Sequence, residues 1–97
     1  MYFIQPTRNI PYLDQVLSTL PSVQMICIDD IDLYDPTILA IADVQDYLTH
    51  QWSLPTIVLA FENEGTALAQ AWELGALAGW IWNKLPRDPE GALLKID

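Results

Sequence analysis

Residues 54–86 constrain the fold more than any other stretch, because they read as strand, helix and strand in immediate succession. Thr56–Phe61 is an apolar run rich in β-branched residues and too short for a helix, so it predicts a strand. Thr66–Leu74 contains good helix formers, and Gly75 follows it as a helix-ending residue. Trp80–Trp82 predicts the next strand. This spacing suits two parallel strands joined by a right-handed crossover.

The rest of the chain continues the alternation of strands and helices. Val23–Ile28 is apolar throughout, which is typical of a central parallel strand buried on both faces. Asp35-Pro36 combines an N-cap residue with a proline, a pair that predicts the start of a helix. The pattern predicts one α/β domain over residues 1–97. Its remaining elements are a strand at Tyr2–Gln5 and helices at Pro11–Leu20, 35–50 and Glu90–Ile96.

The charge of the chain is strongly acidic and unevenly distributed. The net charge is −9, and lysine and arginine occur only at Arg8, Lys84, Arg87 and Lys95. Ten of the thirteen acidic residues fall between residues 9 and 83, where no basic residue occurs. A nucleic-acid ligand is not expected, because neutralising phosphates requires a basic face. A basic protein partner, a cation or solubility alone would explain the charge.

The single cysteine and the lengths of the apolar runs bear on location. Cys27 has no partner for an intrachain disulfide, which fits a reducing compartment, and it lies in an apolar run that predicts a core position. No apolar run reaches the roughly 20 residues that a membrane helix needs. We therefore expect a cytoplasmic protein that does not contact a membrane.

Residues 23–86 resemble the receiver domain of response regulators. The resemblance rests on the motif PTIVLAF at residues 55–61, on ELGA at 73–76 and on an aromatic strand followed by Lys84. It implies a three-layer, flavodoxin-like parallel sheet, shortened by about one strand–helix unit. The missing unit would lie between the first helix and the central strand. Alternatively, Pro6–Pro21 folds irregularly and the sheet edge is trimmed.

The residues that follow the predicted strands are candidates for metal binding. Ligands of open parallel sheets bind beyond the carboxyl ends of the strands, where Asp29, Asp30 and Glu62 would meet near Lys84. Such carboxylates could bind Mg²⁺ weakly. The other interpretation is that they are polar strand ends in contact with water.

The resemblance also assigns roles to single positions. Asp29 would stand at the phosphoacceptor position, while Ala60 would replace the switch hydroxyl and Trp80 would stand near the switch aromatic. Lys84 would match the lysine after the last strand. No acidic pair follows the first strand, so the main metal ligands of a receiver are absent from the sequence and Asp29 is expected to be inactive.

Aromatic residues near the end of the chain predict a surface for a protein partner. In receivers, partners bind the face built from the last helices and the last strand. Large aromatic and arginine side chains are typical of binding hot spots. The alternative is that the tryptophans fill the core. The predicted partner-binding residues are Trp72, Trp80, Trp82, Lys84 and Arg87.

These features predict a non-catalytic pseudo-receiver that binds a signalling protein and is not switched by phosphorylation. One alternative is a phospho-accepting receiver that uses Asp29, with Asp30 helping to hold Mg²⁺. Another is a small acidic adaptor or inhibitor that covers a basic surface, with Asp43, Asp46 or Glu73 on the binding face. A trimmed sheet edge could also pair two copies as a homodimer.

Overall fold

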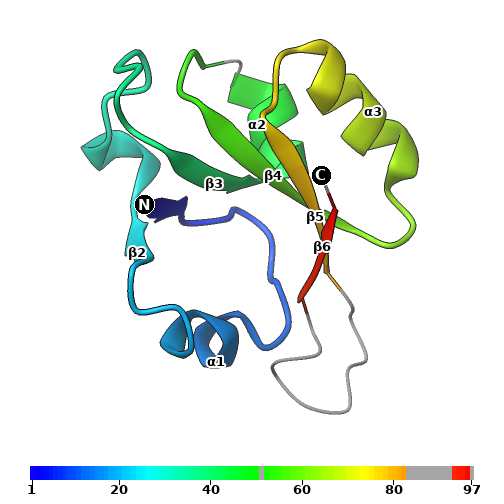
Figure 1. The fold of residues 1–97 in the computed structure, drawn as a ribbon, viewed down its shortest axis with the longest axis horizontal. Coiled ribbons are helices and arrows are strands. Elements are labelled where there is room, and N and C mark those ends of the chain that lie inside the picture. The colour runs from blue at the N-terminus through cyan, green and yellow to red at the C-terminus, as the bar shows by residue number, and fades with distance from the viewer. Residues whose placement is uncertain (51, 83–92, 97) are drawn as a thin grey trace.

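The computed structural model describes residues 1–50, 52–82 and 93–96, and the elements run in the order shown in Figure 1. The six strands form one sheet in the order β2-β1-β3-β4-β5-β6. The first five are parallel, and β6 pairs antiparallel with β5. The elements are β1 (Tyr2–Ile4), α1 (Leu13–Ser18), β2 (Gln24–Ile26), the 3₁₀ turn η1 (Ile28–Asp30), β3 (Ala40–Asp43), α2 (Val44–His50), β4 (Thr56–Phe61), α3 (Gly65–Glu73), β5 (Ala78–Trp82) and β6 (Leu93–Ile96).

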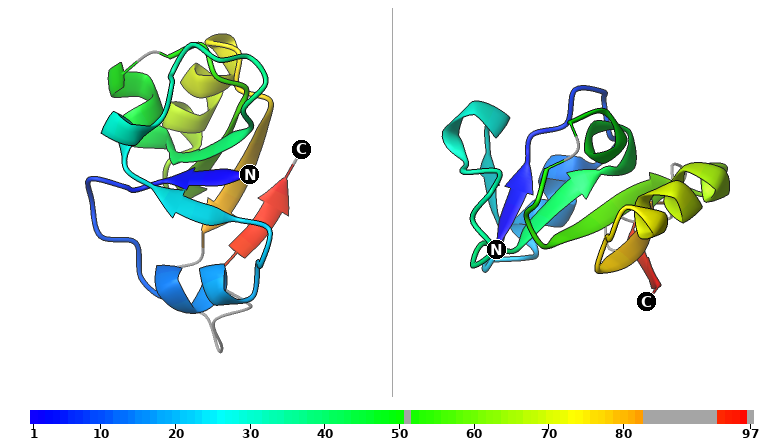
Figure 2. Two further views of the ribbon diagram at one scale, coloured as in Figure 1. Left: turned by 90° about the vertical axis from the view of Figure 1, so that its left-hand side faces the viewer. Right: turned by 90° about the horizontal axis from the view of Figure 1, so that it is seen from above.

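Helices cover both faces of the sheet, which makes three layers. Figure 2 (left) shows the sheet between α1 below and the pair α2 and α3 above. A hydrophobic core lies on each face of the sheet, and alternate residues of β4 point into one or the other. Val58 and Ala60 pack in the core that includes Leu68 of α3. Leu59 and Phe61 pack in the core that includes Val16 of α1. The predicted class, a shortened flavodoxin-like α/β fold, is therefore confirmed.

The shortening lies elsewhere than the sequence predicts. All five parallel strands are present, and they take the 2-1-3-4-5 order of flavodoxin-like sheets. Between β2 and β3 the chain forms only η1 and turns, where the full fold has a crossover helix. The predicted last helix, 90–96, is wrong for residues 93–96, which form β6; residues 90–92 lie outside the described part.

The central strand is β3, which the sequence predicts as part of a helix. Asp35 explains the error: its side chain accepts hydrogen bonds from the backbone N–H and hydroxyl of Thr37, at 2.9 and 2.7 Å, and so closes a turn and not a helix cap. The following Ala40–Asp43 is buried along its whole length between β1 and β4. In contrast, β2 is a three-residue edge strand, although residues 23–28 were predicted to be central.

Residues 56–82 follow their prediction closely. β4 spans Thr56–Phe61 as expected, and α3 differs by one residue at each end. Gly75 has a φ of 102°, and the backbone N–H groups of Gly75 and Ala76 close the helix end on the carbonyls of Trp72 and Ala71. Trp80 and Trp82 point to the α1 side of the sheet, and Ile81 to the other.

Candidate functional site

The candidate site is a set of charged side chains at the carboxyl ends of three neighbouring strands. Arg8 lies in the loop after β1, Asp43 is the last residue of β3, and Glu64 lies between β4 and α3. β3 is hydrogen-bonded to both β1 and β4, so the ends of these strands are adjacent (Figure 1). In parallel α/β sheets, this edge is where ligands bind.

The guanidinium of Arg8 binds both carboxylates in paired contacts. Nε and Nη2 donate to the two oxygens of Asp43 at 2.7 and 2.6 Å. Nη1 and Nη2 donate to the two oxygens of Glu64 at 2.9 and 2.6 Å. This forked geometry uses the planar donor set that distinguishes arginine from lysine. One cation therefore joins the ends of β3 and β4.

Further contacts hold Glu64 and Arg8 in position. Glu64 accepts hydrogen bonds from the Gln45 amide and from the backbone N–H of Phe61, both at 2.9 Å. The guanidinium carbon of Arg8 lies 4.2 Å from the centre of the Phe61 ring, a cation–π contact. The cluster is thus built from side chains with several partners each.

A second contact fixes the same loop to the start of α2. The backbone N–H and hydroxyl of Thr7 donate to Asp46 at 3.2 and 2.7 Å, and Asp46 is buried. Asp46 lies in the first turn of α2, where a negative charge is favourable. Thr7 and Arg8 together anchor the loop after β1 to the β3–α2 junction.

The two carboxylates bound by Arg8 differ in their electrostatics. Burial raises the pKa of Asp43, and repulsion from Asp46 and Glu64 adds to this effect, so that the pairing with Arg8 is outweighed. Burial also acts to raise the pKa of Glu64, but the hydrogen bonds from Arg8, Phe61 and Gln45 lower it to about 2. Burial acts to lower the pKa of Arg8, and the two carboxylates reverse this and raise it, which keeps the guanidinium charged.

The predicted metal site at Asp29, Asp30 and Glu62 does not form. Asp29 and Asp30 lie in η1 beyond the edge strand β2, and Glu62 follows β4, with β1 and β3 between. All three are exposed, and among the described residues no three or more His, Cys, Asp or Glu side chains are arranged so that they could hold a metal ion. The error follows from treating residues 23–28 as the central strand. The residue that ends the central strand is Asp43, so the assignment of Asp29 to that position is also wrong.

The predicted switch positions occupy different surroundings. Ala60 is fully buried, faces α2 and α3, and is followed by Phe61 as the last residue of β4. Trp80 is half-buried and packs on the α1 side of the sheet. Lys84 and Arg87 lie outside the described residues.

The tryptophans do not form one surface. Trp82 is 1% exposed, and its indole N–H donates to the carbonyl of Pro11 at 2.9 Å. It is a core residue, so its prediction as a partner contact is wrong. Trp72 is 43% exposed on α3, the helix on the opposite face of the sheet from Trp80 and Trp82. Cys27, predicted to be in the core, is exposed.

The pattern of the sequence does not predict the arginine cluster, although the placement of its basic residues singles out Arg8. Arg8 is the first of four basic residues and is separated from the next, Lys84, by a long acidic segment. A single arginine in such an acidic chain is expected to form an ion pair with a carboxylate. The sequence does not reveal which carboxylates it binds, because that depends on the position of β3.

Comparisons with models of protein families, with curated proteins and with solved structures gave no match. Among the described residues, no helix has the length and apolar character required to cross a membrane.

Proposed function

We propose that this chain is a non-catalytic, receiver-like module that binds a protein partner and is not switched by phosphorylation. The observation that carries the proposal is the binding of Asp43 by Arg8. Asp43 ends the central strand, its side chain has no exposed surface, and both of its oxygens accept hydrogen bonds from one guanidinium. Neither a phosphodonor nor a metal ion can reach it without displacing Arg8.

The chemistry of phosphoryl transfer supports this proposal. The transition state spreads negative charge that metal ions must neutralise while bridging the reacting groups. A guanidinium supplies charge but cannot coordinate a carboxylate and a phosphoryl oxygen as Mg²⁺ does. Here the charge of Arg8 is already balanced by Asp43 and Glu64. The cluster therefore favours a structural role.

The exposed side chains suggest what the partner contacts. Within residues 1–82 Arg8 is the sole lysine or arginine, and it is paired, so the accessible charges of this segment favour a basic partner. Trp72, Leu74 and Leu77 are 43%, 53% and 61% exposed within six residues of chain. The sequence predicts Lys84 and Arg87 as further partner contacts. We propose that Trp72, Leu74 and Leu77 contact the partner together with them, in place of the buried Trp82.

The first test is an amide-resolved NMR titration with Mg²⁺, followed by beryllofluoride as a phosphoryl mimic. We expect no saturable shifts at Arg8, Asp43 or Glu64. An Arg8→Gln variant that remains folded is the matched comparison, because it frees the carboxylates and should gain affinity for Mg²⁺. Saturable binding of both reagents at Asp43 in the native protein would overturn the proposal.

A second candidate function is an acidic adaptor that covers a basic surface, which the net charge of −9 favours. Of the residues predicted for its binding face, Asp43 and Asp46 are buried, and only Glu73 is exposed. Affinity for a basic partner should then fall steeply with salt and fall when Glu73 is neutralised. Affinity that depends on Trp72 and hardly on salt would favour the receiver-like module.

The exposed, unpaired thiol of Cys27 supports a cytoplasmic location for either function.

A further inference from the structure

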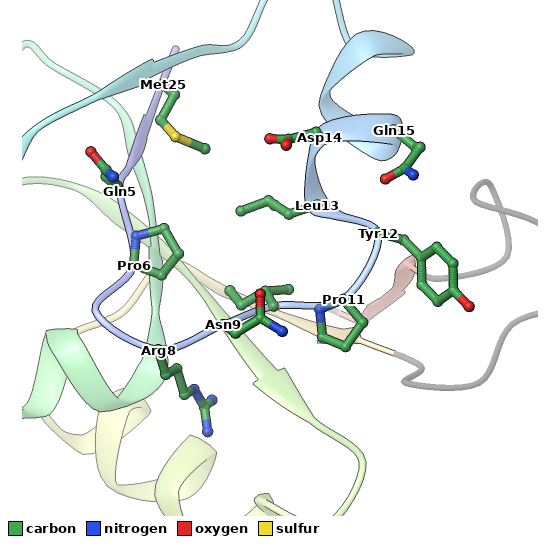
Figure 3. A pocket seen from close by; sticks show the side chains of 11 residues that line it. Gln5, Pro6, Arg8, Asn9, Pro11, Tyr12, Leu13, Asp14, Gln15 and Met25 are labelled. Carbon is green, nitrogen blue, oxygen red and sulfur yellow. The ribbon is translucent and has the colours of Figure 1, made fainter.

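A hollow of about 420 Å³ lies beside the carboxyl end of β1, and the proposed function does not use it. Its walls are the loop after β1, the first turn of α1 and Met25 of β2 (Figure 3). Its size is within the range of small-ligand sites. It also lies next to the edge of the sheet where α/β proteins bind ligands.

Among the described residues that line the hollow, Asp14, an exposed side chain of α1, is the one charged group without an opposite charge beside it. In Figure 3, Asp14 and Leu13 point into it from α1, and Asn9 points into it from the loop. Arg8 also borders it, but its side chain points away, towards α2 and α3, and is bound by two carboxylates. Of the described lining residues, an anion would therefore meet a carboxylate and no free cation.

The remaining walls combine apolar and amide groups. Pro6, Ile10, Leu13 and Met25 offer aliphatic surface, and the side chain of Asn9 offers an amide oxygen as an acceptor. An aliphatic chain that ends in an ammonium group matches this set, because its stem packs on apolar surface while its head donates to oxygens.

The backbone at the rim of the hollow is strained. Tyr12 has φ 62° and ψ 14°, and it is the one residue other than glycine with positive φ in the described part of the chain. Its side chain is 43% exposed and points away from the hollow. Strained conformations of this kind cluster at ligand sites. Here the strained residue directly precedes Leu13 and Asp14.

We propose that this hollow binds an alkylammonium group, with the ammonium at Asp14 and the aliphatic stem against Leu13 and Met25. The group could come from a lysine side chain of a protein partner or from a free aliphatic amine. The lysine source rests on the proposed function, whereas the amine chemistry of the hollow does not.

The test is an amide-resolved NMR titration of the whole chain with two probes, Nα-acetyl-lysine N-methylamide and cadaverine. We expect saturable shifts at Asn9, Leu13 and Asp14 in the millimolar range. The Nε-acetylated form of the first probe, which lacks the charge, should not produce them. Tighter binding of the capped lysine would identify a partner side chain, and tighter binding of cadaverine would identify a free amine.

Two variants make the outcome decisive. Asp14→Asn should weaken binding about fivefold, which corresponds to the upper end of the range for an exposed ion pair. Glu62→Gln removes an exposed carboxylate elsewhere and should leave the affinity unchanged. Equal effects of the two variants, unsaturable shifts spread over the acidic residues, or no shifts would overturn the proposal. None of these results depends on the response of Asp43 to Mg²⁺ and beryllofluoride, so the two proposals can fail separately.

Discussion

Nη2 of Arg8 lies 2.6 Å from one oxygen of Asp43, and Nε lies 2.7 Å from the other, across 35 residues of sequence. This pair joins the loop after the first strand to the last residue of the central strand. Asp43 has no exposed side-chain surface, so its charge depends on Arg8 for compensation. A carboxylate buried in this way is costly once its partner is removed.

Arg8→Met should therefore lower the free energy of unfolding by about 3 kcal/mol, because it leaves a buried carboxylate unpaired. Arg8→Lys retains the positive charge but not the paired hydrogen bonds, so it should lower the free energy of unfolding by less. Denaturant unfolding of the three proteins measures both effects. If the methionine variant is as stable as the native protein, the pair has no structural role.

Glu64 should contribute to stability in a way that depends on pH. Its pKa is about 2 in the folded protein, below its ordinary value of 4.5. The folded state thus binds the proton less tightly than the unfolded state does. The stabilisation is fully present above about pH 4.5 and is lost as the pH falls towards 2. Allowing for solvent screening, we expect about 1–2 kcal/mol.

The matched variants are Glu64→Gln and Glu62→Gln, two neighbouring residues of which only the first binds Arg8. Unfolding measured from neutral to acid pH should show that Glu64→Gln loses the acid-dependent part of the stability. Glu62→Gln should retain it. The same pH profile for both variants would contradict the role assigned to Glu64.

Asp43 should show the opposite behaviour. Burial raises its pKa above the ordinary value of 3.8, so the folded state binds this proton more tightly than the unfolded state does. Its contribution to stability is greatest below pH 3.8 and is lost as the pH rises through the folded pKa. Titration of side-chain carboxyl ¹³C shifts measures both groups directly. An Asp43 signal that titrates below 3.8 would show that Arg8 outweighs burial.

The sequence predicts the fold class and strands β4 and β5 because the signals there are local. Thr56–Phe61 and Gly75 carry strand and helix-end preferences that the folded chain keeps. Residues 40–43 carry no such signal: two alanines favour a helix, and burial on both faces overrides that preference. Because the sequence does not predict β3, it places the residue that ends the central strand at Asp29, whereas the structure places it at Asp43. A site whose residues come from several strands can therefore be predicted only when each of those strands, and their order in the sheet, is predicted.

Two glycines should respond in opposite ways to substitution by alanine. A Cβ at Gly79 would lie 2.6 Å from Cδ1 of the buried Leu68, so this side chain must move. We expect Gly79→Ala to cost about 1–2 kcal/mol. A Cβ at Gly65, the first residue of α3, would meet nothing within 4 Å. Gly65→Ala should be neutral or stabilise by up to about 0.5 kcal/mol, since glycine is a poor helix former. Thermal unfolding of the two variants distinguishes them, and equal melting temperatures would contradict the packing of α3 on β5.

Substitution of Trp82 and of Trp72 by alanine should change the free energy of unfolding by very different amounts, because the first is buried and the second is exposed. Trp82→Ala removes a side chain that is 1% exposed, together with its hydrogen bond to Pro11, and should cost about 3–5 kcal/mol. Trp72→Ala removes one that is 43% exposed and should cost less than about 1 kcal/mol. Chemical denaturation measures both losses, and partner binding by the folded Trp72 variant then tests its proposed contact. If Trp82→Ala were as stable as Trp72→Ala, Trp82 would not be a core residue. Its original prediction as a partner contact would then regain support.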